Sequence, residues 1–170
     1  MGEYRRKGAD AFGLFLLPCL LALLPWRLAF LLLHRVAAVR AWQGAEVARA
    51  WSVARQHLPH VEEADFCQRL RLLQLVERVD TWLSLLRSAR WWRNQIDVVG
   101  HWPEQQQGSI LLTFHWGAGF WVWRALLDHG IHAHFLAKRP QAEDLGGSPI
   151  ALRYAALRVR VLQRIGCAGV

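Results

Sequence analysis

The stretch SILLTFHWGAGFW (residues 109–121) decides the predicted fold of this chain. Residues 110–114 form a continuous apolar run, which is typical of a strand that is buried on both faces. The run ends at His115, Gly117 and Gly119 follow, and a helix-like apolar pattern begins at Phe120. This order predicts a buried strand, a glycine-rich turn and a helix, with His115 at the end of the strand.

The residues after this stretch continue the alternation. We expect a helix over residues 120–129 that ends at Gly130 as a C′ glycine, and a strand over residues 131–137. A polar loop (residues 141–149) and a further helix (residues 150–166) follow. Strand, helix, strand, helix predicts an α/β fold with a mainly parallel sheet in βαβα order. Sites in such sheets lie at the carboxyl ends of strands, where His115, Lys138 and Arg139 are found.

Helices dominate the chain before this stretch. Residues 36–57 carry apolar residues at helical spacing, and Pro59 is expected to end that helix. Glu62 or Asp65 starts the next predicted helix, which runs to about residue 92. Residues 94–102 look like a short strand closed by Gly100. The second helix combines an apolar stripe with a mixed polar face; the stripe comprises Phe66, Leu70, Leu73, Val76, Val79, Leu83 and Leu86, and the polar face Arg69, Arg71, Glu77, Arg78 and Asp80.

Residues 11–33 are predicted to be an N-terminal membrane segment, because they contain about the 20 apolar residues that a spanning helix needs and one charge, Arg27. Pro18 and Pro25 interrupt the segment. It therefore either spans with a kink or lies at the interface, and a buried helix of a soluble protein is the alternative. No small-residue cleavage site follows, which argues against a signal peptide. Residues 36–170 form the second predicted unit.

The composition indicates an anionic partner. The net charge is +8 and the chain has 10 tryptophans, and both arginine and tryptophan favour the headgroup zone of a membrane. Nucleic acid is the other anionic partner to consider. The alternative without a functional meaning is that the positive charge reflects an arginine-rich proteome. The cysteines, Cys19, Cys67 and Cys167, imply neither a disulfide framework nor a zinc site, so a reducing compartment is expected.

The histidines offer one catalytic candidate. His132 and His134 share one face of a predicted strand, but no acid recurs at a metal-ligand spacing, so we expect no metal. His129 lies at a helix end, where the helix dipole favours a cation. His115 alone has the strand-end and glycine-turn setting of a general base.

Together, the N-terminal apolar segment, the ARQHLP stretch (residues 54–59), GSILLTFHWGAGFW (residues 108–121) and Arg139-Pro140 resemble the lipid A acyltransferases. These lauroyl and myristoyl transferases are a branch of the lysophospholipid acyltransferase superfamily. The resemblance implies that His115 takes the proton of the acceptor hydroxyl, with Gly117 and Gly119 close to the thioester carbonyl. It also implies that Lys138 and Arg139 bind phosphate of the acceptor.

The chain departs from this family at one position that matters. The family motif places an acid after the histidine at the position that Phe120 occupies here. A base without its orienting acid can lose up to ~10⁴-fold in rate in a hydrolase triad. Asp128 is more than two helical turns beyond Phe120, and the sequence leaves open whether Glu143 or Asp144 folds back. The family domain also continues beyond the length found here, so residues 36–170 are expected to be its N-terminal portion.

Two functions follow as expectations. The first is a membrane-bound acyltransferase of lipid A type at the cytoplasmic side of a bacterial inner membrane. It would move a fatty acyl group from an acyl carrier protein or CoA thioester to a lipid or glycolipid hydroxyl, without a further cofactor and without nucleic acid. The alternative is a catalytically impaired or non-catalytic relative that binds membrane lipid or a protein partner.

Overall fold

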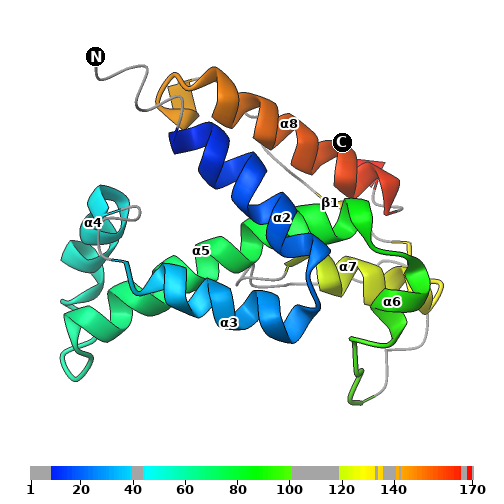
Figure 1. Ribbon diagram of the computed structural model, residues 1–170, viewed down its shortest axis with the longest axis horizontal. Helices are drawn as coiled ribbons and strands as arrows, with labels where there is room; N and C mark the ends of the chain where they lie inside the picture. The colour runs from blue at the N-terminus through cyan, green and yellow to red at the C-terminus, as the bar shows by residue number, and fades with distance from the viewer. Residues whose placement is uncertain are drawn as a thin grey trace.

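The fold is organised around one long helix, α5 (Glu63–Leu86), which runs through the middle of the molecule (Figure 1). The computed structural model describes residues 9–39, 44–100, 119–132, 134–135, 141, 143–165 and 168–169. Helices α2, α3, α4, α7 and α8 all contact α5. Glu62 is its N-cap residue, and the acids of its first turn suit the positive end of the helix dipole.

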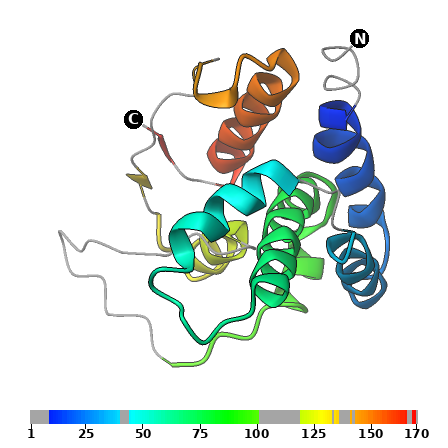
Figure 2. The same cartoon turned by 90° about the vertical axis from the view of Figure 1, so that its left-hand side faces the viewer.

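The N-terminal layer consists of η1 (Phe12–Leu16), α2 (Leu17–Leu23) and α3 (Trp26–Ala37). Figure 2 shows these helices together on one side of α5. Pro18 follows the π-helical turn η1, and Pro25 separates α2 from α3. Leu24 has an extended backbone (ψ 158°), as expected for a residue that precedes proline.

Trp82 and Arg71 of α5, together with Arg87 directly after it, bind backbone carbonyls of these helices at a proline or at a helix end. Pro18 has no N–H for the carbonyl of Leu14, and the indole N–H of Trp82 donates to that oxygen at 3.0 Å. Arg87 donates to the carbonyl of Leu24 at 2.7 Å, and Arg71 donates to that of Ala37 at 2.7 Å. The breaks in the N-terminal layer are therefore satisfied by the helix below it.

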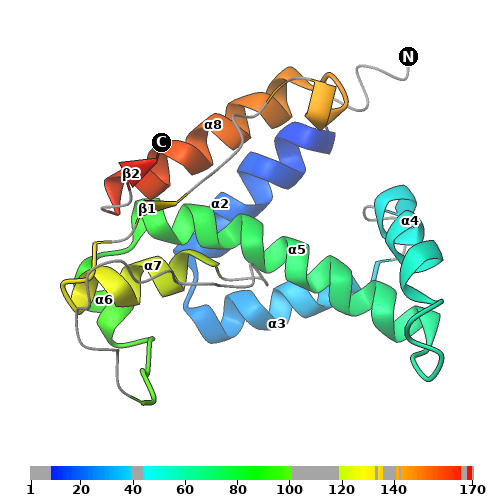
Figure 3. The ribbon, with the colours of Figure 1, turned by 180° about the vertical axis from the view of Figure 1, so that it is seen from behind.

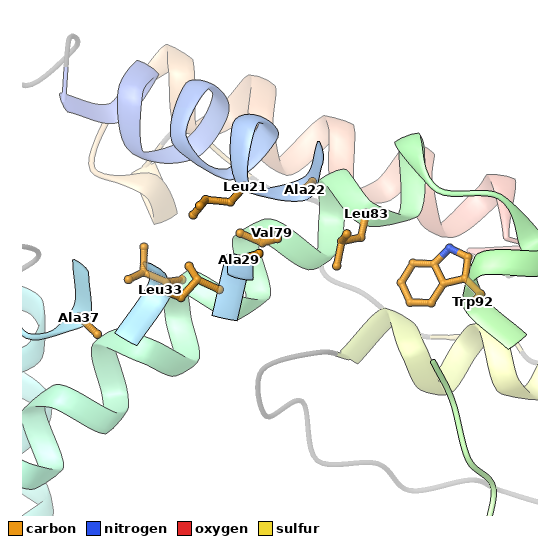
Figure 4. Packing of buried hydrophobic residues seen from close by; sticks show 9 residues of the cluster. Leu21, Ala22, Ala29, Leu33, Ala37, Val79, Leu83 and Trp92 are labelled. Carbon is orange, nitrogen blue, oxygen red and sulfur yellow. The ribbon is translucent and has the colours of Figure 1, made fainter. Parts of the chain in front are cut away.

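The main core lies between the N-terminal layer and α5 (Figure 4). Small and branched residues alternate in it, which allows the helices to approach closely. Trp92, which belongs to α6 (Ala89–Arg93), lies at one end of this core. The buried members are Leu21, Ala22, Ala29, Leu33, Ala37, Leu75, Val79, Leu83 and Trp92.

Two predicted helices are each divided in two. The helix predicted over residues 36–57 falls partly in α3 and partly in α4 (Gly44–Ala54), and residues 40–43 lie outside the described part. The second ends at Leu86 with an extended Arg87, and α6 then begins after Ser88, whose hydroxyl accepts the N–H of Trp91. Phe66, Leu70, Leu73 and Val76 are only half-buried and Leu86 is exposed, whereas Arg71 and Asp80 are buried. The predicted stripe of α5 was thus partly wrong, because several helices surround α5.

Helix α7 (Gly119–Asp128) confirms the helix predicted at residues 120–129. Gly130 has a φ of 72°, and its N–H donates to the carbonyl of Leu127. The N–H of Ile131 donates to Leu126, so the helix ends in a Schellman motif with glycine at C′, as predicted.

Helix α8 (Pro149–Arg164) confirms the last predicted helix. Ser148 is its N-cap and accepts the N–H of Ala151, and Pro149 occupies the first helical turn, where its missing N–H costs nothing. A 3₁₀ turn, η2 (Glu143–Leu145), precedes it.

The predicted α/β class is wrong. Residues 94–100 form no strand, and the sheet found in the described part is one parallel pair, β1 (His134–Phe135) with β2 (Ala168–Gly169) (Figure 3). Residues 109–115, where the buried strand was expected, lie outside the described part. The described chain is mainly helical because every long apolar pattern in it has the helical period and packs on α5.

Helix length also bears on the predicted membrane segment. Among the described residues, no helix is both long and apolar enough to cross a bilayer. Pro25 is the physical reason, since it divides the apolar run into two short helices.

Candidate functional site

Most of the residues predicted to form the site lie outside the described part of the chain: His115, Gly117, Lys138 and Arg139. Gly119 is described, and it is the half-buried first residue of α7. The first turn of α7 directly follows the predicted histidine turn in the chain, and the side chains that contact it surround the candidate site.

Asp80 of α5 holds that first turn. Its carboxylate Oδ2 accepts the backbone N–H of Phe120 at 2.8 Å, and the side chain is 1% exposed. One turn further along both helices, the guanidinium of Arg124 donates to the carbonyl of Ser84 at 3.0 Å. These two bonds join α7 to α5, and the first brings a carboxyl to the backbone of position 120, where the resembling family has its acid.

Burial raises the pKa of Asp80 to about 8, because a carboxylate loses its hydration in this environment. The N–H of Phe120 and the charge of Arg158 favour the charged form and oppose this rise, whereas the charge of Glu77 adds to it. The indole N–H of Trp121 lies close enough to Asp80 to favour the charged form slightly, although it is not placed to donate a hydrogen bond to the carboxyl. Asp80 is thus a buried acid with a strongly raised pKa, which is a property of functional carboxyls as well as of structural ones.

A second polar group from α8 completes the surroundings of Asp80. Arg158 donates to Glu77 of α5 at 2.6 Å, and its guanidinium stands 5.6 Å from the centroid of the Phe120 ring. The hydroxyl groups of Thr81 and Tyr154 lie 3.1 Å apart, and burial raises the pKa of Tyr154. Charged and polar side chains of α5 and α8 therefore lie beneath the start of α7.

Buried polar atoms without a hydrogen-bond partner concentrate in the same place. We call this place the α5–α7 junction; it comprises residues 80–92 and 119–124. Within the described part of the chain, all such side-chain atoms belong to it: Asp80 Oδ1, Ser84 Oγ, Arg87 Nε, Trp92 Nε1, Trp121 Nε1 and Arg124 Nε. Native proteins keep few groups of this kind, so their concentration marks the junction as a candidate functional site.

Aromatic rings surround the junction on the side of the N-terminal layer. The Trp121 ring contacts Trp92, Trp91 and Trp26, with ring centroids 5.2, 6.2 and 5.6 Å away. The guanidinium of Arg124 stands over Trp92, and that of Arg87 over Trp91. Aromatic rings and arginine side chains thus cover the junction on this side.

The other predicted histidines are not part of this site. His129 lies at the C-terminal end of α7 with its Nδ1 2.7 Å from the carbonyl of Ala125, as the helix-end position suggested. His132 and His134 are exposed. No group of three or more His, Cys, Asp or Glu side chains among the described residues is arranged to hold a metal ion.

A groove of about 790 Å³ lies at the opposite end of α5, near α4. Its lining is mostly apolar: Leu58, Val61, Phe66, Leu70 and Leu73. On its rim Arg69 pairs with Asp65 at 2.9 Å, and Glu62 and His60 also line it. Its lining residues lie before α5 and in the N-terminal half of that helix, whereas the first turn of α7 contacts Asp80 further along α5.

No protein-family model, curated protein or solved structure matches this chain. The resemblance to the acyltransferases therefore rests on the sequence motifs alone.

Sequence reasoning missed Asp80, because it assigned this residue to the polar face of α5 and searched for an acid only after His115. Asp128 and Glu143, two of the acids considered there, are exposed. One signal was present: Asp80 and Ser84 are four residues apart and lie beside Val79 and Leu83, so they share a face that borders the apolar stripe.

Proposed function

We propose that the protein is a membrane-bound O-acyltransferase of the lipid A biosynthesis type. It moves a fatty acyl group from an acyl carrier protein or CoA thioester to the hydroxyl of a lipid or glycolipid, at the cytoplasmic face of a bacterial inner membrane. The observation that carries this proposal is the 2.8 Å hydrogen bond between the Phe120 N–H and Asp80, which supplies a buried carboxyl at the motif position that lacks one.

In the proposed reaction, His115 takes the proton of the acceptor hydroxyl while the hydroxyl oxygen attacks the thioester carbonyl. The tetrahedral intermediate then collapses, the C–S bond breaks, and the thiol leaves with the proton that His115 returns. Backbone N–H groups near Gly117 and Gly119 stabilise the oxyanion, and Lys138 and Arg139 bind phosphate of the acceptor.

Asp80 acts as the positioning residue in this proposal. A carboxylate that orients an imidazole also stabilises its charged form, and the imidazolium in turn lowers the pKa of the acid. The charged groups near Asp80 are Glu77 on α5, Arg124 on α7 and Arg158 on α8. Because the pKa of Asp80 is about 8, the rate is expected to increase as pH rises toward 8.

The test measures acyl transfer by the full chain in membranes with an acyl thioester donor. His115→Ala should abolish turnover, and retained activity would refute the proposed function. Asp80→Asn keeps an acceptor for the Phe120 N–H and should lower kcat by about 10²- to 10⁴-fold. It should also remove the rise in rate toward pH 8, which a purely structural role would leave in place. Asp128→Asn, an exposed acid of the same α7, is the matched control.

Phe120 itself favours the second candidate function, a non-catalytic relative that binds lipid or a partner. Its side chain is buried in an apolar cluster with Trp123, Leu126, Val161 and Ile165, so position 120 has become a core position. Lipid binding without turnover in wild-type protein would favour this candidate.

A further inference from the structure

The outward face of the N-terminal layer is apolar. Side chains of η1 and α2 are exposed at intervals of three or four residues, so they form one stripe along the helix. Beyond Pro25, α3 exposes four more large apolar side chains. The exposed residues are Phe12, Leu16, Leu20, Leu23, Leu28, Phe30, Leu31 and Leu32.

This surface is additional to the core face of the same helices. Leu21, Ala29 and Leu33 already pack on α5, and the outward face of a surface helix is normally polar. Helix α8 shows the ordinary arrangement, since Arg153, Arg160, Gln163 and Arg164 are exposed on it. An apolar face of this extent marks a site of interaction with a membrane or a protein.

The charges on the layer are positive. No Asp or Glu occurs between residues 11 and 45. Arg27, Leu31 and Arg35 follow one another at intervals of four residues and are all exposed, so two guanidinium groups flank a leucine on the same face. Leucines with neighbouring arginines and no acid suit a bilayer, because its acyl chains lie beneath a layer of anionic headgroups.

The geometry of the layer suits a surface position. Residues 9–23, which include η1 and α2, are continuously helical over about 22 Å, and the 12 residues of α3 make another helix of about 18 Å. Each is shorter than the hydrocarbon core of about 30 Å. The bond from Arg87, at the C-terminal end of α5, to the carbonyl of Leu24 ties the bend between the two helices to α5, and both helices lie on the same side of α5 (Figure 2).

We propose that the outward face of the N-terminal layer docks on the surface of a bilayer that contains anionic lipids, with its leucines at the boundary of headgroups and acyl chains and Arg27 and Arg35 on lipid phosphate. This docking requires no acyl transfer. A second copy of the chain is the less favoured occupant, because a self-complementary contact would bring like charges together on a face that has no acid.

The experiment measures co-sedimentation of the full chain with vesicles of phosphatidylcholine alone or mixed with phosphatidylglycerol, without donor or acceptor substrate. We expect binding to the anionic vesicles and little to the neutral ones. Leu23→Glu with Leu31→Glu (59% and 54% exposed) should abolish binding. Val53→Glu on α4 (62% exposed) is the matched control and should bind normally. Arg27→Gln and Arg35→Gln should each weaken binding about five-fold.

Three results would overturn the proposal. The first is equal binding by the Leu23→Glu and Leu31→Glu double variant, provided that circular dichroism shows the wild-type helix content. The second is equal binding of the wild type to neutral and anionic vesicles. The third is a stable dimer in sedimentation velocity without lipid that these substitutions dissociate, which would assign the face to a second copy. Since no turnover is measured, a failed acyltransferase assay leaves this test intact, whereas failed vesicle binding would contradict the membrane attachment in the proposed function but not the acyl transfer.

Discussion

The two halves of the molecule pack on α5 in different ways. The N-terminal layer covers α5 with an apolar core, and the polar side chains there, Trp82, Arg71 and Arg87, bind backbone carbonyls. Helices α7 and α8 share a smaller apolar cluster, and polar side chains such as Asp80 and Arg158 lie beside it. Most buried polar atoms without a partner thus belong to the second half, at the α5–α7 junction, although two of them, Arg87 Nε and Trp92 Nε1, are on side chains that also pack with the first half. This difference suggests that the first half provides stability and the second provides function.

The largest effect is expected in the core of the N-terminal layer. Leu33 is 0% exposed, so Leu33→Ala removes buried methyl groups and leaves a cavity, which should lower the free energy of unfolding by about 2–5 kcal/mol. Leu31→Ala, two residues away and 54% exposed, is the control and should change it by less than about 0.5 kcal/mol. Urea unfolding followed by circular dichroism measures both. Similar losses for the two variants would mean that Leu33 is not part of the core.

The second prediction concerns Asp80, where a substitution is expected to raise the free energy of unfolding instead of lowering it. The folded chain holds a proton on Asp80 up to a pKa of about 8, whereas the unfolded chain releases it near 3.8. Between these values the native state binds more protons, so this group stabilises the fold most below pH 4, and the contribution is lost as pH rises through 8. Asp80→Asn cannot ionise, and it should remove a loss of a few kcal/mol between these two pH values.

Unfolding free energies of wild type and Asp80→Asn at a series of pH values test this sign. Asp65→Asn, an exposed acid on the same helix, should retain the wild-type slope. The opposite result would be a wild-type free energy of unfolding that increases from pH 5 to 8, with the increase absent in Asp80→Asn. It would show that the Asp80 carboxyl is charged in the fold. The junction would then resemble the N-terminal half in having its charges satisfied.

The same contrast explains what the sequence could predict. Helical periodicity correctly predicted α7 and α8 and most of α5, which ends at Leu86 rather than near residue 92, and Gly130 correctly marked the end of α7, because these signals are local. The pattern could not show that Asp80 is buried, since its role depends on α7, 40 residues further along the chain. Short apolar runs were the weakest signal: residues 94–100 have the composition of a strand, yet in the structure they form none.

The smallest effect tests how far the second half depends on its local backbone signals. Gly130 has a φ of 72°, a conformation that costs other residues about 1–2 kcal/mol, so Gly130→Ala should destabilise the chain by about 1 kcal/mol. Gly44→Ala, in the first turn of α4 with open space around the position of a Cβ, should be neutral or slightly stabilising. Thermal unfolding of both variants measures the difference. Equal midpoints would mean that packing of Ile131 against the α7–α8 cluster, rather than the glycine, ends α7, and that this half too is held by its apolar contacts.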